Sequence, residues 1–124
     1  MEPRIIKSRF GALTVQDGEK TVEYGYDILI RPDGEVTRRE KELSKQVYGT
    51  SHTISLAEAE QIFRVGADCL LVGTGLFGRV SLSGEAAAFL KERAVRVHLA
   101  TTPKAIKRWN ELSGNVIGLF HVTC

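Results

Sequence analysis

The sequence contains little cysteine, little proline and no long apolar run. Its two cysteines, Cys69 and Cys124, are too few for the disulfide framework of a small secreted domain, so both are expected as reduced thiols. No apolar run approaches the roughly 18 residues of a membrane-spanning helix, and no apolar signal segment follows the first few residues. These absences exclude a disulfide scaffold and favour a cytoplasmic protein that does not span a membrane.

The bulk composition is that of one globular domain with charges of both signs. Hydrophobic residues make up 43% of the 124 positions and charged residues 26%, which argues for a single domain over residues 1–124 and against disorder. The net charge is +2, and the basic excess lies after residue 86, where Lys104, Lys107 and Arg108 share the last predicted helix. Nucleic-acid-binding faces usually have a stronger basic bias with interleaved aromatic residues, so nucleic acid is not the favoured partner.

The first part of the chain has the pattern of a strand meander. Short runs of β-branched and aromatic residues are separated by turn signals such as Asp17-Gly18 and Asp33-Gly34. The predicted strands cover residues 4–10, 13–16, 21–30 and 35–39. The polar stretch 40–53 is predicted to be an irregular loop with one short helical turn, and a loop of this length in a small domain is often functional.

The second part changes to helical periodicity and alternates helices with strands. Ser55 with Glu58 fits a capping box, Ser83 fits an N-cap, and Thr102 before Pro103 fits a helix start. Helices are predicted from these positions to about residues 66, 93 and 114, and strands over 68–72, 95–100 and 116–123. The alternation favours parallel strands covered by helices, so we predict a three-layer α/β domain with a mixed central sheet and an N-terminal antiparallel β-meander.

Gly73, Gly75 and Gly78 spell the G-x-G-x-x-G of a dinucleotide-binding loop directly after a predicted buried strand. The fingerprint requires the helix to begin at the loop, but here its cap is Ser83, about five residues late. It also requires an acidic residue about 20 positions further on, where this chain has His98. The sequence therefore predicts no dinucleotide and no other cofactor.

The same glycines still mark a candidate ligand site. Gly73, Thr74 and Gly75 follow one predicted strand, and Thr101 and Thr102 follow the next, so both segments are expected at the carboxyl edge of the sheet, where ligands of α/β proteins bind. The helix that opens there would offer N–H groups to a small anion. The alternative is a glycine turn that approaches a neighbouring loop, beside an ordinary N-cap.

The histidines and cysteines form no pattern that indicates catalysis or metal binding. His52 and His121 are secondary site candidates, but no H-x-x-x-H or C-x-x-C spacing exists, so no metal site and no catalytic residue is predicted. Within the predicted last strand, His121 and Cys124 would point to opposite faces, about 10 Å apart, which excludes a nucleophile pair. Asn110 is expected to satisfy backbone groups.

Several stretches resemble a known family along the whole chain: "YDILI", "SHTIS", "LLVGTG", "TTPKAIKRWNEL" and "LFHVTC". The chain is similar to small single-domain proteins that are widespread in archaea and bacteria and have eukaryotic relatives that include the mitochondrial complex I assembly factor 3 and the adipogenesis-associated domain-containing protein. The resemblance implies a three-layer α/β fold in which one strand runs against the others, which would remove the closing strand from the candidate edge. It implies no established enzymatic activity and favours a protein-binding role.

Three functional hypotheses follow. The leading one is a non-catalytic, assembly-factor-like accessory protein with a protein partner and a small anion at the Gly73–Gly75 and Thr101–Thr102 edge. The alternatives are a small-molecule enzyme that uses the same edge, and nucleic-acid binding through the basic C-terminal helix.

Overall fold

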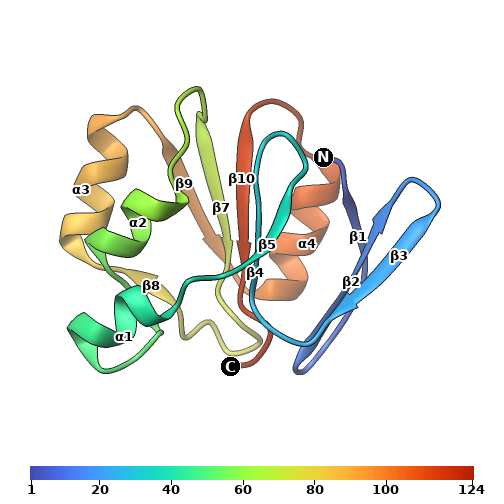
Figure 1. Cartoon of the computed structure of the whole chain (residues 1–124), viewed down its shortest axis with the longest axis horizontal. Coiled ribbons are helices and arrows are strands. Elements are labelled where there is room, and N and C mark those ends of the chain that lie inside the picture. Colours follow the sequence, from blue (N-terminus) through green and yellow to red (C-terminus); the bar gives the residue numbers. More distant parts are fainter.

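The computed structural model describes residues 1–124 and is built around a five-stranded mixed sheet (Figure 1). The strand order is β5-β4-β10-β7-β9, with β10 parallel to β7 and β7 parallel to β9, while β4 runs antiparallel to both of its neighbours. The strands are β4 (Ile28–Ile30), β5 (Val36–Arg38), β7 (Cys69–Gly73), β9 (Arg96–Ala100) and β10 (Val116–Phe120). The strand that runs against its neighbours is therefore β4, and the closing strand β10 keeps its carboxyl end beside that of β7.

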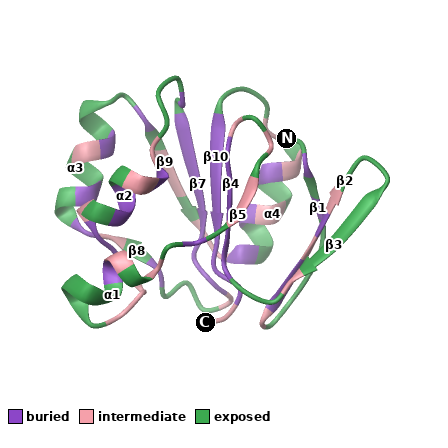
Figure 2. Ribbon diagram, viewed as in Figure 1, coloured by how far each residue is buried: buried purple, intermediate pink, exposed green.

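Helices cover both faces of this sheet, so the predicted three-layer α/β fold is confirmed (Figure 1). Helices α2 (Leu56–Ile62) and α3 (Gly84–Glu92) lie on one face, and α4 (Thr102–Glu111) lies on the other. Because β7 and β10 are covered on both sides, all of their residues are buried (Figure 2). None of the helices has the length and apolar character to cross a membrane.

The predicted β-meander is present as a separate antiparallel sheet of β1 (Arg4–Arg9), β2 (Ala12–Asp17) and β3 (Lys20–Tyr24), which packs against α4. The single strand predicted over 21–30 is wrong, because the chain leaves this sheet after Tyr24 and enters the central sheet at Ile28. The two strands in this stretch differ in burial, because β3 is mostly exposed and β4 is fully buried. Both environments accept β-branched residues, so composition does not reveal the break.

Trp109 of α4 is the largest side chain in the core and lies against the sheet. A Cβ at Gly118 would overlap the rings of Trp109 and Phe120, so the glycine makes room for the indole. The indole N–H donates to the Pro3 carbonyl at 2.7 Å, and the side-chain amide of Asn110 pairs with both backbone groups of Ile5 at 2.8 and 3.0 Å. Asn110 therefore has the structural role that the sequence indicated.

The stretch 40–53, predicted as an irregular loop with one short helical turn, contains the seven-residue helix α1 (Glu42–Tyr48), which is longer than the turn predicted there. The N-cap position Lys41 makes no side-chain cap, so there is no local start signal. Instead the buried Ser44 hydroxyl donates to Glu58 of α2, and this tertiary contact holds the helix. Two short strands that the sequence did not indicate, β6 (Thr53–Ile54) and β8 (Ser81–Leu82), form a parallel pair nearby.

Two of the three predicted helix starts are confirmed. Ser55 accepts from the Glu58 N–H and Ser83 from the Ala86 N–H, so both N-caps are confirmed. The third N-cap is Thr101, not Thr102, and Thr101 makes no side-chain cap. Thr102 is the first residue of the helix, and its hydroxyl donates to the His121 carbonyl. The last strand ends at Phe120, three residues earlier than predicted.

Candidate functional site

The two segments of the predicted ligand edge lie in direct contact. The Gly75 N–H donates to the Thr102 hydroxyl at 2.9 Å, and the Thr102 N–H donates to the Gly75 carbonyl at 3.1 Å. The backbone N–H and the hydroxyl of Thr74 both donate to the carbonyl of Ala100, at 2.8 and 3.0 Å. The strand-terminal turn after β7 and the start of α4 thus meet through hydrogen bonds, and Thr101 precedes the helix as its N-cap.

The chain's own C-terminal residues pack onto this edge. The N–H of Leu76 donates to the Thr123 carbonyl at 2.8 Å, and the Thr102 hydroxyl donates to the His121 carbonyl at 2.6 Å. Gly75 has a φ of 98°, and a Cβ there would overlap the Cys124 backbone and the His121 ring. Its glycine is explained by the approach of a neighbouring segment. The surface has three pockets, and none is lined by Gly73, Thr74, Gly75, Thr101 or Thr102.

A buried network of charges lies beside this edge, with Arg39 at its centre. Its guanidinium contacts Asp27 at 3.0 Å and Glu58 at 2.7 Å, and it donates to the Ser51 carbonyl at 2.6 Å. Burial alone would lower the pKa of Arg39, but the hydrogen bond and charge of Glu58, together with Asp27, raise it above its ordinary value. All three side chains are at least nine-tenths buried, so the group is an ion triad inside the protein.

Asp27 connects this triad to the C-terminal segment. Its Oδ2 lies 2.7 Å from Nδ1 of His121, and its Oδ1 accepts from the Val122 N–H at 3.0 Å. Burial opposes ionisation of the carboxyl group, but the hydrogen bond and charge of His121, the Val122 N–H and Arg39 outweigh it and lower the pKa of Asp27. Asp27 is therefore an ionised carboxylate that orients the imidazole.

Two histidines and a cysteine converge at this point. The rings of His52 and His121 lie edge to face with centroids 5.5 Å apart, and Cys124 Sγ is 4.0 Å from Nε2 of His52. One side-chain ligand atom of each of the three residues lies within 4.8 Å of those of the others. Thr123 Oγ1 is 3.1 Å from Nε2 of His121. We call Asp27, His52, His121, Thr123 and Cys124 the C-terminal corner.

The predicted separation of about 10 Å between His121 and Cys124 is wrong. The alternation of side chains holds only within a strand, and residues 121–124 leave β10 and turn across the edge. His52 comes from the segment after α1, which contacts α2. Burial and the nearby His121 and Arg79 lower the pKa of His52 and favour its neutral form. Sequence spacing contains no signal for this convergence, because His52 and the C-terminal tail are distant in the sequence.

The order Asp27, His121, Thr123 is that of an acyl-transfer relay, but no substrate space adjoins it. None of the three pockets is lined by a residue of the C-terminal corner. A nucleophile requires a cleft in which the reacting carbon approaches within about 3 Å. The corner is therefore a hydrogen-bonded cluster at the surface without an adjoining pocket.

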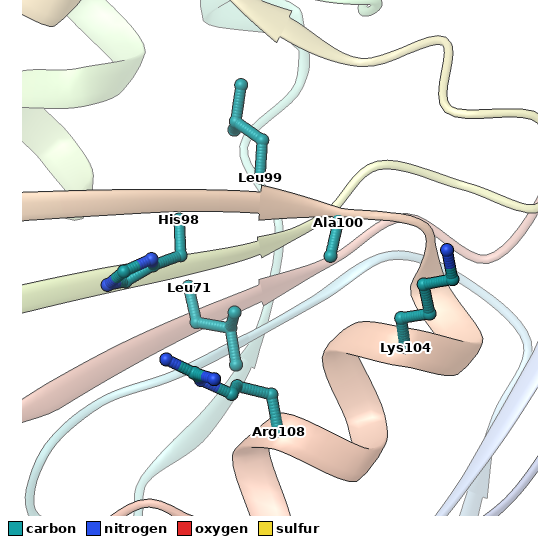
Figure 3. A pocket seen from close by; sticks show the side chains of 6 residues that line it. All are labelled: Leu71, His98, Leu99, Ala100, Lys104 and Arg108. Atoms are coloured by element: carbon teal, nitrogen blue, oxygen red, sulfur yellow. The ribbon is translucent and has the colours of Figure 1, made fainter.

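A different surface combines a pocket with unpaired positive charge. This hollow of about 300 Å³ lies between β9 and α4 (Figure 3), and we call it the basic hollow. His98 and Ala100 point from β9 toward α4, whereas Leu99 points to the opposite side of the strand (Figure 3). No carboxylate lines the hollow, and neither of its lysine and arginine side chains forms an ion pair. The lining residues are Leu71, His98, Leu99, Ala100, Lys104 and Arg108.

Strand β9 forms one edge of the central sheet and pairs only with β7. The Arg96 N–H and the Ala100 carbonyl are bonded on the β7 side. Since hydrogen-bonding directions alternate along a strand in a parallel pair, the backbone groups of Val97 and Leu99 point outward. Leu99 of this edge strand is 49% exposed.

These features define a small α/β domain with a buried ion triad at the carboxyl edge and an open basic strand edge. The chain belongs to the family described as "Protein of unknown function (DUF498/DUF598)", whose model matches residues 5–121. This confirms the family resemblance of the sequence.

Solved structures of similar chains share the fold. A conserved hypothetical protein from Pyrococcus horikoshii is 36% identical with a TM-score of 0.88, covering 98% of this chain and 99% of that one. A protein named MT938 is 31% identical with a TM-score of 0.77, covering 98% of each chain. A Bordetella pertussis protein described as an Mth938-like domain is 17% identical with a TM-score of 0.63, covering 97% of this chain and 85% of that one, and it supports the fold alone.

Proposed function

We propose that the protein is a non-catalytic accessory protein that binds an extended acidic segment of another protein along the free edge of β9. The observation that carries the proposal is the open backbone edge beside the unpaired cations of the basic hollow. A cytoplasmic location, supported by the unpaired thiols of Cys69 and Cys124, is part of this proposal.

The backbone of the edge suits a partner in extended conformation. The outward N–H and C=O groups of Val97 and Leu99 have the spacing that an added strand pairs with. Such pairing supplies affinity that is independent of sequence. The side chains next to the edge then select which segment binds.

The side chains of the edge favour alternating acidic and apolar residues in the partner. An added strand points alternate side chains to the two faces of the sheet. On the α4 face they would meet Lys104 and Arg108, which lack a carboxylate partner, and on the other face they would meet the exposed Leu99. A partner carboxylate in the basic hollow takes the place of the small anion that the sequence predicted at the glycine edge.

The test uses a labelled peptide in which Glu alternates with Val, with binding followed by fluorescence anisotropy. The wild-type protein is expected to bind it, and the double variant Lys104→Glu/Arg108→Glu is expected to bind at least about tenfold more weakly, which is about 1.4 kcal/mol. Lys107→Glu is the matched control, since Lys107 is exposed on the same helix and does not line the hollow. It is expected to retain most of the affinity.

Further probes separate the contributions of backbone and charge. Methylation of alternate peptide amides is expected to abolish binding if the peptide adds a strand, and replacement of Glu by Lys is expected to abolish binding through charge. Absence of binding at millimolar peptide, or equal affinity for the Lys peptide, would overturn the proposal. Tighter binding of a single-stranded oligonucleotide, lost in the same double variant, would favour the nucleic-acid hypothesis instead.

A further inference from the structure

We infer that His52, His121 and Cys124 form a binding site for a divalent transition-metal ion, and that Zn²⁺ is the ion that this ligand set suits best. The inference rests on the convergence of three ligand atoms within 4.8 Å of one another. It is independent of the proposed peptide binding, because it uses none of the residues of the basic hollow.

The ligand types and distances fit zinc. Zn²⁺ takes imidazole nitrogen and thiolate sulfur at about 2.0–2.3 Å in tetrahedral geometry, which places neighbouring ligand atoms about 3.3–3.7 Å apart. Cys124 Sγ and His52 Nε2 are already 4.0 Å apart. Side-chain rotations that bring these two atoms closer by less than about 1 Å would give them the spacing of two ligands on one zinc ion. Oxygen-preferring Mg²⁺ and Ca²⁺ do not suit this ligand set.

The surroundings fix His121 in the orientation that a ligand needs. Nδ1 of His121 lies 2.7 Å from Asp27 Oδ2, so Asp27 holds this side of the ring and Nε2 is the nitrogen that can bind a metal ion. Asp27 is held in turn by the buried Arg39, which pairs with Glu58. This is the carboxylate and histidine arrangement of zinc sites, and here the fold supplies it without a metal ion.

The site is reachable from solvent and leaves one coordination position open. His52 and Cys124 are only half-buried, which provides an entry path. On binding, the Cys124 thiol releases its proton to solvent, the thiolate forms the bond to the metal ion, and the two imidazoles donate lone pairs. Thr123 would exchange its hydrogen bond to His121 Nε2 for one to a water in the fourth position.

The test titrates the chelator-treated protein with Co²⁺ and with Zn²⁺ alone. Co²⁺ is expected to give a thiolate charge-transfer band and intense visible bands of tetrahedral coordination, at one ion per chain. Zn²⁺ is expected to displace it. Cys124→Ser and His52→Gln are each expected to weaken binding by at least about 100-fold, because each removes a direct ligand. Both residues are half-buried, so the thermal midpoint without metal should change little.

Matched controls use the remaining thiol and a remote histidine. Cys69→Ala and His98→Gln should leave the cobalt spectrum and the affinity unchanged, since both lie outside the cluster. Asp27→Asn should weaken affinity by about 10–100-fold while the charge-transfer band remains, because Asp27 positions His121 without touching the metal ion. If wild-type protein gives no thiolate band, or if Cys124→Ser binds as well as wild type, the inference is overturned.

Discussion

The C-terminal corner with its ion triad differs from the basic hollow in the burial and the pairing of its charged side chains. In the first region Asp27, Arg39 and Glu58 are buried and every charge has a partner, whereas in the second Lys104 and Arg108 are exposed and have none. A buried charge destabilises a protein unless it is paired, but an exposed charge costs little and stays available. The triad therefore stabilises the fold, and the cations of the hollow remain unpaired.

The largest effect is expected from breaking the triad. Glu58→Ala leaves the Arg39 guanidinium buried with only Asp27 as a charge partner, and it removes the acceptor of the Ser44 hydroxyl that holds α1. We expect a loss of about 3–5 kcal/mol in the free energy of unfolding, measured by urea denaturation followed by circular dichroism.

The exposed ion pair between Arg9 and Glu23 provides the matched control, because both side chains are more than half exposed. Glu23→Ala should cost less than about 1 kcal/mol in the same measurement. If Glu58→Ala and Glu23→Ala lowered the free energy of unfolding equally, the contribution of an ion pair to stability would not depend on its burial.

A smaller loss is expected at the glycine turn that supports the C-terminal corner. Gly75→Ala places a side chain at a φ of 98° and against the Cys124 backbone, and we expect a loss of about 2–3 kcal/mol in thermal or urea unfolding. Gly84→Ala, at the first residue of α3 with open space around it, should be neutral or stabilising by up to about 1 kcal/mol. A neutral Gly75→Ala would contradict the close approach of the tail.

The smallest effect on stability is expected in the basic hollow. Lys104→Glu/Arg108→Glu should change the free energy of unfolding by no more than about 0.5 kcal/mol per substitution, although it should weaken peptide binding at least about tenfold. Denaturation and anisotropy on the same samples test both halves of this statement. A large loss of stability would show that these cations support the fold.

Sequence patterns predicted the elements whose signals are local. Ser55 and Ser83 begin helices where their caps indicated, and the alternation of helices and strands gave the layered fold. Helix α1 was predicted only as one short turn, because its support, the Ser44 contact with Glu58, comes from another helix. A capping signal at Thr102 was misplaced by one residue, because that hydroxyl bonds the Gly75 N–H and the His121 carbonyl.

The candidate site was predictable only in part. The sequence placed Gly75 and Thr102 at one edge of the sheet, and the structure brings them together. It named His52 and His121 as separate candidates, but their contact with each other and with Cys124 had no sequence signal. The end of β10 at Phe120 decided this, because a strand continued to residue 123 would have separated His121 from Cys124.

The sequence by itself determined the fold class and most helix starts, because these depend on patterns and caps within short segments, and the motifs spread along the chain determined the family. Only the tertiary structure decided which charges are paired and which are free. Arg39 meets Asp27 and Glu58 across 12 and 19 positions, and His121 meets Asp27 across 94. The energy of a charge depends on its burial and on neighbours in space, and these are fixed only when the sheet brings distant segments to a common edge.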